Sequence, residues 1–296
     1  MPSNDLDPRG PASTTDTDPV RRTLLHAAAL AAPAALLART ARAAGQNPAA
    51  IDTGPTRSAL VTGSSRGIGA ATARRLAQDG YAVTINYLSS RGLAEQVVRE
   101  ITDAGGKAVC VQADVSDPQA VRRLFDAHHE AFGSLHVAVA NAGIQRLGAF
   151  SQMSDADYDQ VIDVNMKGCF HTLREASRRV IDGGRIIALS SGTVTLRPPN
   201  YGPYAASKAA VDVFVNILSK ELAGRMVSVN AIAPGTTNTP LFTDGKTAEQ
   251  IAGFARQTPH QRLGDPQDIA NVISILVSGR GAWINGQVIN ANGGLA

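Results

Sequence analysis

The sequence predicts an α/β fold in which a doubly wound parallel sheet of about seven strands carries helices on both faces. From residue 57 onward, short apolar runs alternate with segments whose apolar residues recur at helical spacing. The apolar runs lack polar alternation, which is typical of parallel strands buried on both faces. Neither an internal repeat nor a low-complexity linker interrupts residues 54–296, so they are expected to form a single domain.

Glycines bound the first strands and helices of this region. A strand is expected at 58–62, where SALVT leads into a glycine-rich loop. A helix follows over 67–79 and ends at Gly80. A second strand is expected at 82–85, and a helix over 93–104 ends at a glycine pair.

The remainder of the region repeats this alternation. A strand is expected at 107–112, and Ser116-Asp117-Pro118 then combines a capping residue with an early proline, which predicts a helix start. The later expected elements are a strand at 136–140, a helix over about 155–180, a strand at 185–190, a helix over about 203–223 and a strand at 227–232. Such βαβ units bind ligands beyond the carboxyl ends of their strands.

Composition excludes several classes of protein. With 44% apolar and 18% charged residues in 296, the chain can build a core and is not disordered as a whole. The net charge of +3 and the lack of basic runs interleaved with aromatics argue against nucleic-acid binding. Two cysteines cannot form a disulfide framework or a four-cysteine zinc site. We expect Cys110 in a central strand, Cys169 packed in the long helix, and His128 and His129 on an exposed helix without metal-ligand spacing.

Residues 1–53 differ from the rest and are expected to form a disordered leader. Arg21 and Arg22 precede a short alanine-rich stretch, and Ala41-Arg42-Ala43 supplies the small residues of a signal-peptidase site. Adjacent arginines and weak hydrophobicity are typical of twin-arginine signals, so we favour export to the periplasm. The alternatives are an unstructured extension or a start codon placed too early, on a cytoplasmic protein. The stretch is too short to span a membrane.

The loop over 62–69, TGSSRGIG, predicts a dinucleotide site. Its glycines allow a tight turn and a close approach of backbone N–H groups to a pyrophosphate, next to a helix N-terminus that favours negative charge. Its spacing differs from G-x-G-x-x-G, and a simple tight turn is the alternative. The loop also fits G-x-S-x-G of serine hydrolases, but only a leader precedes it and His260 is the only histidine far downstream.

The end of the second strand favours NADP over NAD. An NAD site usually places an acidic residue about 20 positions after the glycines, to accept from the ribose 2′-hydroxyl. Residues 86–91 contain no acid. Arg66, Ser89, Ser90 and also Arg91 could instead hold a 2′-phosphate by charge and hydroxyl donors, and a solvated helix start is the alternative for Ser90 and Arg91.

Tyr204 and Lys208 form a Y-x-x-x-K pair that predicts acid–base chemistry. Residues at i and i+4 share one helix face, so the phenol and the ammonium are expected to point into one cavity. A nearby cation favours phenolate and lowers a tyrosine pKa from its usual value of about 10. A bare pair of this kind is more often a surface pair, but Ser190-Ser191 and Asn141-Ala142-Gly143 also follow predicted strands.

Taken together, these motifs resemble the short-chain dehydrogenase/reductase family. The motifs that carry the resemblance are TGSSRGIG at 62–69, Asp114-Val115, NAG at 141–143, Asn165, Ser191, YAASK at 204–208, Pro234-Gly235 and Asn292-Gly293-Gly294. They occur in the family's order and cover roughly residues 57–296. The resemblance implies a Rossmann-like fold and a nicotinamide cofactor.

The resemblance also implies a role for each matching residue. Tyr204 would exchange a proton with the substrate oxygen, Lys208 would bond the nicotinamide ribose and tune Tyr204, and Ser191 would polarise the substrate. Asn165 would hold a water that links Lys208 to solvent. The implied cofactor-binding residues are Gly63, Ser65, Arg66, Gly67, Ile68, Gly69, Asn86, Ser89, Ser90, Asp114, Val115, Asn141, Ala142, Gly143, Tyr204, Lys208, Pro234, Gly235, Thr236 and Thr239.

The sequence leaves the substrate open. Segment 237–259 is polar and resembles a flexible loop, with Leu241, Phe242, Ile251 and Phe254 as its expected apolar lining. The chain is most similar to 3-oxoacyl-(acyl-carrier-protein) reductases, so NADPH-dependent reduction of a 3-oxoacyl-type or other ketone to a secondary alcohol is expected. Oxidation of a sugar or steroid alcohol is one alternative, and a non-catalytic dinucleotide-sensing protein is another.

The expected partners are small molecules and further copies of the chain. Members of the family are usually tetramers or dimers, which implies a homo-oligomer, and Trp283 is expected at a subunit contact. A metal, nucleic acid and stable membrane insertion are not expected.

Overall fold

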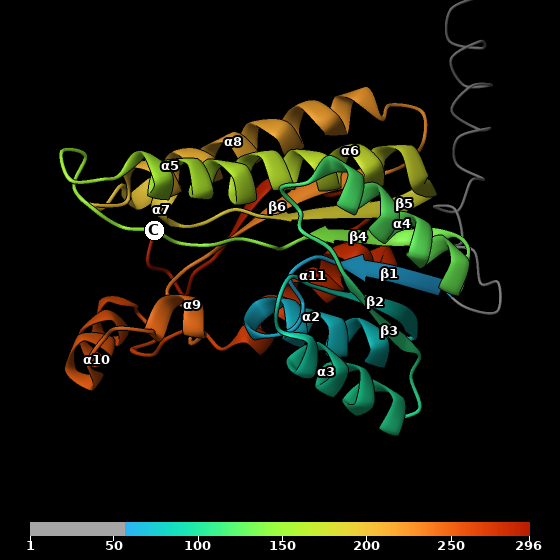
Figure 1. The fold of residues 1–296 in the computed structure, drawn as a ribbon, viewed down its shortest axis with the longest axis horizontal. Coiled ribbons are helices and arrows are strands. Elements are labelled where there is room, and N and C mark those ends of the chain that lie inside the picture. The colour runs from blue at the N-terminus through green and yellow to red at the C-terminus, as the bar shows by residue number, and fades with distance from the viewer. Residues whose placement is uncertain (1–56) are drawn as a thin grey trace, which may run out of the picture. The chain divides into compact units, whose positions relative to one another are not determined.

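The strands pair in the order β3-β2-β1-β4-β5-β6-β7, and all neighbouring pairs are parallel (Figure 1). The computed structural model describes residues 57–296, and the predicted leader with its export signal lies outside them. The strands are β1 (Arg57–Val61), β2 (Tyr81–Tyr87), β3 (Ala108–Gln112), β4 (Leu135–Ala140), β5 (Val180–Leu189), β6 (Ser228–Pro234) and β7 (Val288–Ala291). The predicted doubly wound parallel sheet is confirmed.

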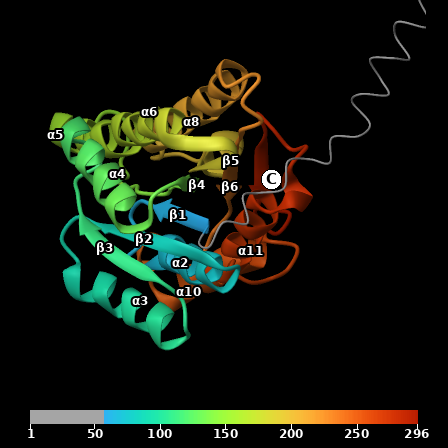
Figure 2. The ribbon, with the colours of Figure 1, turned by 90° about the vertical axis from the view of Figure 1, so that its right-hand side faces the viewer.

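Helices cover both faces of this sheet (Figure 2). The helices are α2 (Gly67–Gln78), α3 (Arg91–Asp103), α4 (Pro118–Phe132), α5 (Asp155–Val161), η1 (Ile162–Lys167), α6 (Gly168–Arg179), α7 (Thr193–Leu196), α8 (Gly202–Glu221), α9 (Pro240–Thr243), α10 (Ala248–Gln257), α11 (Pro266–Val277) and η2 (Gly279–Gly281). One core cluster joins α4, α6 and α8 to one face of the sheet, and a second joins α2, α3 and α11 to the other. These two cores explain why the central strands are buried on both faces and are mostly apolar.

The predicted helix starts and ends agree with the structure where a cap or a glycine marks them. The side chain of Asp117 caps α4 by accepting from the backbone N–H of Gln119, with Pro118 in the first turn. Strand β5 is the largest shift, because it starts at Val180, well before the predicted 185. After the buried Val180, residues 181–183 are exposed or partly exposed and include Gly183 with φ of +79°, so they lack the apolar pattern of a buried strand.

The helix predicted over 155–180 is one continuous helical run with a change of pitch inside it. It comprises α5, the π-helical segment η1 and α6. Single π turns occur often at functional sites. Here the π turn contains Asn165, whose side chain is buried.

Segment 237–259 is not a plain loop. It contains the short helix α9 and the longer α10, which begins with a capping box between Thr247 and Gln250. The loop prediction followed from the polar composition of the segment and did not use the capping box, which is a local helix signal. Helix α11 and strand β7 were also not assigned from the sequence.

Two predictions about the placement of single residues were wrong: the exposure of His128 and the strand that contains Cys110. His128 is buried, since its ring nitrogens contact the hydroxyl groups of Ser58 (3.0 Å) and Thr84 (2.8 Å) beneath the sheet. Cys110 lies in β3, which is the edge strand rather than a central one, because the chain places β3 outside β2. Cys169 is buried in α6 as expected.

The strand order reverses between β1 and β4, and this reversal positions the site. The connections after these two strands diverge to opposite faces, which leaves a crevice at their carboxyl ends. Within residues 57–296, no helix combines the length and apolar character that a membrane span requires.

Candidate active site

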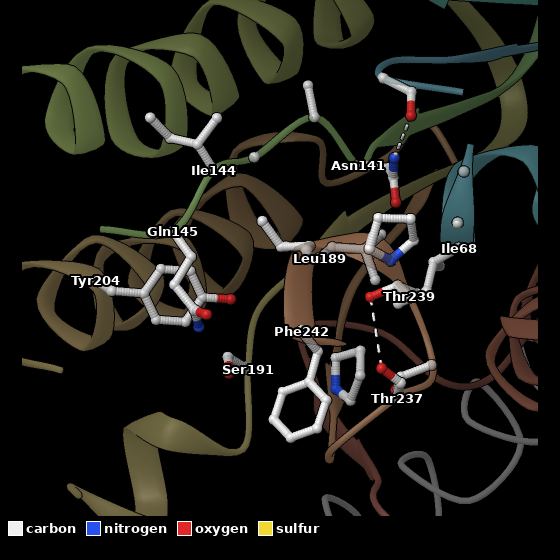
Figure 3. A pocket seen from close by; sticks show the side chains of 18 of the residues that line it. Ile68, Asn141, Ile144, Gln145, Leu189, Ser191, Tyr204, Thr237, Thr239 and Phe242 are labelled. Carbon is white, nitrogen blue, oxygen red and sulfur yellow. Dashed lines mark hydrogen bonds between the residues drawn. The ribbon is translucent and has the colours of Figure 1, made fainter. Parts of the chain in front are cut away.

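A cavity of about 740 Å³ lies at the carboxyl ends of the central strands, where the sequence predicted the ligand site. Its walls come from the segments that directly follow β1 to β6, together with residues of α8 and α10. Figure 3 shows Tyr204 and Gln145 on one side of this cavity, Ile68 and Asn141 on the other, and Phe242 between them. Every residue that the sequence assigned to cofactor binding lines it.

Two glycines of the loop after β1 are required by geometry. Gly63 has φ of +62°, and a Cβ there would come within 2.8 Å of the Ala142 Cα. A Cβ on Gly69 would lie 2.5 Å from the Gly63 carbonyl oxygen. The loop therefore packs its bare backbone against the segment after β4, which is the close approach that a pyrophosphate site needs.

Amide side chains hold this loop in place. The Asn141 Nδ2 donates to the carbonyl oxygens of Thr62 (2.8 Å) and Gly63 (3.1 Å). Asn86 accepts from the Gly63 backbone N–H (3.0 Å) and donates to the Ala113 carbonyl oxygen (3.0 Å). Asn86 is buried, so its part in the site is to fix the shape of the loop.

The loop also carries the cation that was expected at a 2′-phosphate. The exposed Arg66 guanidinium donates to the Ser90 hydroxyl, and Ser89 lines the same end of the cavity. Arg91 is different, because it pairs with Glu95 at 2.7 Å one turn along α3 and does not line the cavity. Arg66 is thus the arginine of this pair that faces the cofactor end.

The predicted catalytic residues meet at the other end of the cavity. Tyr204, Lys208 and Ser191 are all buried, and all three line it. The Lys208 Nζ lies 6.0 Å from the centroid of the Tyr204 ring and donates to the Leu189 carbonyl oxygen at 2.7 Å. The i, i+4 spacing thus brings the ammonium and the phenol together, as predicted.

Burial dominates the electrostatics of this pair. It raises the pKa of Tyr204, while a hydrogen bond from Ser191 lowers that pKa in part. Burial likewise lowers the pKa of Lys208, against the neighbouring Asp212 carboxylate, which raises it. The expected depression of the tyrosine pKa by the lysine is therefore not the leading effect in the protein without ligands.

Asn165 lies behind the cavity rather than in its wall. Its Oδ1 accepts from the Ile144 backbone N–H (2.8 Å), and its Nδ2 donates to the Ile144 carbonyl oxygen (2.9 Å) and to Ser207 (3.2 Å). The π turn brings this amide under the segment after β4. It fixes the backbone of Ile144, which lines the cavity together with its neighbour Gln145. The predicted water-holding role of Asn165 stays a prediction.

The structure adds residues that the sequence did not single out. Thr193 bonds the Ser191 hydroxyl oxygen, and Gln145, Gln160 and Tyr201 line the substrate end. Of the predicted apolar lining, Leu241, Phe242 and Phe254 are present, whereas Ile251 is not part of the wall. These positions lie in irregular segments or on separate elements, so no periodic signal could have identified them.

No cluster of three or more His, Cys, Asp or Glu side chains suited to a metal ion occurs among residues 57–296. The polar groups at the catalytic end of the cavity are the Ser191 hydroxyl, the Tyr204 phenol and the Lys208 ammonium.

Comparison with known proteins identifies the family. A family model described as enoyl-(acyl carrier protein) reductase matches residues 63–296. A short-chain type dehydrogenase/reductase from Picea abies is 41% identical over 248 residues, which cover 80% of this chain and 92% of that protein. An NADPH-dependent aldehyde reductase-like chloroplastic protein from Arabidopsis thaliana is 42% identical over 252 residues, covering 80% of this chain and 93% of that one.

A solved structure agrees with these relatives. The short chain dehydrogenase from Burkholderia cenocepacia, crystallised in complex with NADP, superposes with a TM-score of 0.77 at 38% identity, covering 81% of this chain and 97% of that one. The fold agrees with that of this neighbour. The chain belongs to the short-chain dehydrogenase/reductase family of oxidoreductases.

Proposed function

We propose that this protein is an NADPH-dependent carbonyl reductase that converts a ketone or aldehyde to an alcohol. The observation that carries the proposal is that one cavity contains both a cofactor-binding end and a catalytic end. The bare-backbone loop with Arg66 lies at one end, and buried Ser191, Tyr204 and Lys208 lie at the other.

The cofactor end fits NADP by its own chemistry. A guanidinium beside two serine hydroxyls suits a dianionic 2′-phosphate, because charge-assisted hydrogen bonds are about twice as strong as neutral ones. The absence of an acid from Asn86 to Arg91 removes the usual partner of an unmodified ribose. The Burkholderia cenocepacia neighbour binds NADP and the Arabidopsis relative is described as NADPH-dependent, which supports the same choice here.

The catalytic end fits proton transfer to a carbonyl oxygen. Bound NADPH supplies the hydride that reduces the carbonyl carbon. The Ser191 hydroxyl donates a hydrogen bond to the carbonyl oxygen, where negative charge develops, and Tyr204 gives that oxygen its proton. The Lys208 ammonium uses one of its donors on Leu189, which leaves two for ribose hydroxyls, and its charge stabilises the tyrosinate that forms.

The substrate end favours an uncharged carbonyl compound with an apolar or aromatic body. The aromatic side chains in its wall are Tyr201, Phe242 and Phe254, and the last two pack edge-on with ring centroids 5.1 Å apart. The basic residues that line the cavity are Arg66 and Lys208, which serve the cofactor and the phenol. A carboxylate or phosphate on the substrate would find no further cation in this wall.

Turnover of NADPH tests the proposal. Purified protein is mixed with NADPH and a panel of neutral aliphatic and aryl ketones and aldehydes, and cofactor oxidation is followed by absorbance. We expect turnover with at least one neutral aromatic carbonyl, and slower turnover with NADH. Sugar and steroid alcohols with NADP⁺ test the oxidative alternative.

The matched control is Tyr204→Phe, which removes the phenolic proton and keeps the ring. We expect turnover to fall by about 100-fold or more, since positioned acid–base groups contribute roughly 10²–10⁴. NADPH affinity should stay within about twofold. Tight NADPH binding by the wild type without turnover on any carbonyl would favour a dinucleotide-sensing protein instead.

A further inference from the structure

The hydroxyl oxygen of Ser191 has both of its acceptor positions occupied by one neighbouring residue. The backbone N–H of Thr193 donates to the Ser191 Oγ at 3.2 Å. The Thr193 hydroxyl donates to the same oxygen at 3.0 Å. A serine hydroxyl has two lone pairs and one proton, so these two bonds leave only the proton for a further interaction.

The backbone around Thr193 keeps it in this position. Thr193 opens the single turn α7, in which the Val194 N–H bonds the Ser191 carbonyl oxygen at 3.1 Å. The Gly192 N–H bonds the Pro234 carbonyl oxygen at the end of β6 at 2.9 Å. A Cβ on Gly192 would come within 3.3 Å of that same oxygen, so the turn packs closely against β6. The threonine hydroxyl is therefore held over Ser191 by the sheet, and not by a mobile side chain alone.

An unconstrained serine would have a second, unproductive arrangement. Its oxygen could accept the phenolic proton of Tyr204, which would hold that proton away from the substrate. Carbonyl reduction needs both Ser191 and Tyr204 to donate toward one oxygen, where negative charge develops. Two bonds from Thr193 to the serine oxygen exclude the unproductive arrangement, because a third donor would find no lone pair.

We propose that Thr193 is a positioning residue that fixes Ser191 as a hydrogen-bond donor toward the reacting oxygen. This proposal rests on the proposed reductase function. Thr193 acts through Ser191 and not by transferring a proton or a hydride itself. The backbone N–H of any residue at this position would make one of the two hydrogen bonds to Ser191, and the side-chain hydroxyl makes the other.

Thr193→Val tests the side-chain half, because valine keeps the shape and the backbone N–H and removes the hydroxyl. We expect kcat for ketone reduction to fall by about tenfold, less than the 10²–10³ for losing a direct oxyanion donor, because the backbone bond remains. The KM for the ketone and the affinity for NADPH should stay within about twofold. Thr193→Ser, which restores a hydroxyl, should recover most of the lost rate, and Thr193→Ala serves if the valine variant does not fold.

A double-mutant cycle with Ser191→Ala separates positioning from direct contact. If Thr193 acts through Ser191, Thr193→Val should have no further effect in the Ser191→Ala background. An equal loss in both backgrounds would overturn the proposal and indicate that Thr193 touches the substrate itself. Wild-type rates in Thr193→Val would overturn it as well. Wild-type protein without turnover would count against the reductase function, and the titration below then still tests Thr193.

A titration without cofactor or substrate gives an independent readout. The Ser191 hydrogen bond lowers the pKa of Tyr204, and the other titratable groups around the phenol are Lys208 on the same helix and Tyr201 at its start. In Thr193→Val the tyrosinate loses its fixed donor, so the pKa of Tyr204 should rise, and Thr193→Ser should reverse the rise. Ultraviolet absorbance of tyrosinate, corrected with the matching Tyr204→Phe variants, measures this. An unchanged pKa would contradict the proposal.

Discussion

At the scale of one residue, we propose that Arg66 sets which nicotinamide cofactor the site prefers. Its guanidinium reaches the Ser90 hydroxyl at the cofactor end of the cavity, and no acid stands between Asn86 and Arg91. A side chain of this kind has nothing to bind in NADH, because NADH lacks the 2′-phosphate. Its contribution should therefore appear only with the phosphorylated cofactor.

Replacing Arg66 by alanine should raise the KM for NADPH by about 10–100-fold, because a charge-assisted hydrogen bond contributes roughly 1.5–3 kcal/mol. The KM for NADH should change by less than about twofold. Steady-state kinetics with both cofactors measures the difference. Arg91→Ala is the matched control, since Arg91 pairs with Glu95 outside the cavity. Equal losses with both cofactors in Arg66→Ala would contradict the assignment.

Sequence patterns located the reactive side chains but not their immediate partners. The Tyr204–Lys208 pair follows from helical spacing, and Gly63 from the strand–glycine–helix pattern. Thr193 has no such signal, because its importance lies in two bonds to an oxygen that only the folded turn α7 brings near. The same holds for Gln145, which lines the cavity next to Ile144, whose backbone Asn165 fixes.

At the scale of elements, His128 joins α4 to the sheet through two hydrogen bonds, and its burial favours a neutral ring. It contacts Ser58 on β1 and Thr84 on β2, and burial lowers the pKa of His128 from 6.5 to about 4. Because the folded-state pKa lies below the unfolded value, the protonated ring favours unfolding. The stabilisation is complete above pH 6.5 and is lost as the pH falls toward 4.

Acid sensitivity of folding should therefore depend on His128. Between pH 7 and pH 5 the wild type should lose about 2 kcal/mol of unfolding free energy through this one group. In His128→Gln, which keeps hydrogen-bonding groups but does not titrate, that loss should shrink by a similar amount. Urea unfolding at the two pH values measures it. The same pH dependence in both proteins would show that other groups dominate.

The prediction of elements succeeded where a local rule sets the boundary. Gly80 ends α2 and Asp117 caps α4 without help from the rest of the fold. It failed for α10, for the start of β5 and for the burial of His128. For the start of β5 and the burial of His128, packing against other elements decides the outcome, whereas α10 has no buried residue and begins at a capping box, which is a local signal.

At the scale of the whole molecule, the surface carries apolar groups that a single chain leaves exposed. Phe170 on α6 and Val213 and Ile217 on α8 are each about half exposed, and Trp283 near the C-terminus is 99% exposed. Exposed apolar groups gathered on packed helices often mark protein contacts. We propose that copies of this chain associate through these helices, as the family resemblance implies.

Self-association should be visible in the mass and in the fluorescence of the protein. Light scattering should give a multiple of the chain mass of 30.8 kDa. Val213→Asp combined with Ile217→Asp should shift the mass to that of one chain, because burying two carboxylates disfavours the contact. Trp283 is the chain's one tryptophan, so its emission reports directly on that position. A monomeric wild type with emission typical of water-exposed tryptophan would rule out the contact.

The sequence by itself determined the alternation of strands and helices, the glycine loop at 62–69 and the Tyr204–Lys208 pair, because each depends on a local spacing or a backbone requirement. Ser191 was identified by the resemblance to the family pattern. The tertiary structure decided which of these residues share one cavity, since strand order and helix packing bring residues such as Arg66, Asn141 and Ser191 together from distant parts of the chain. It also decided that Cys110 lies at an edge, that His128 is buried and that Thr193 holds Ser191. Those outcomes depend on contacts between elements that lie far apart in the sequence. A local sequence pattern does not specify which elements will pack together.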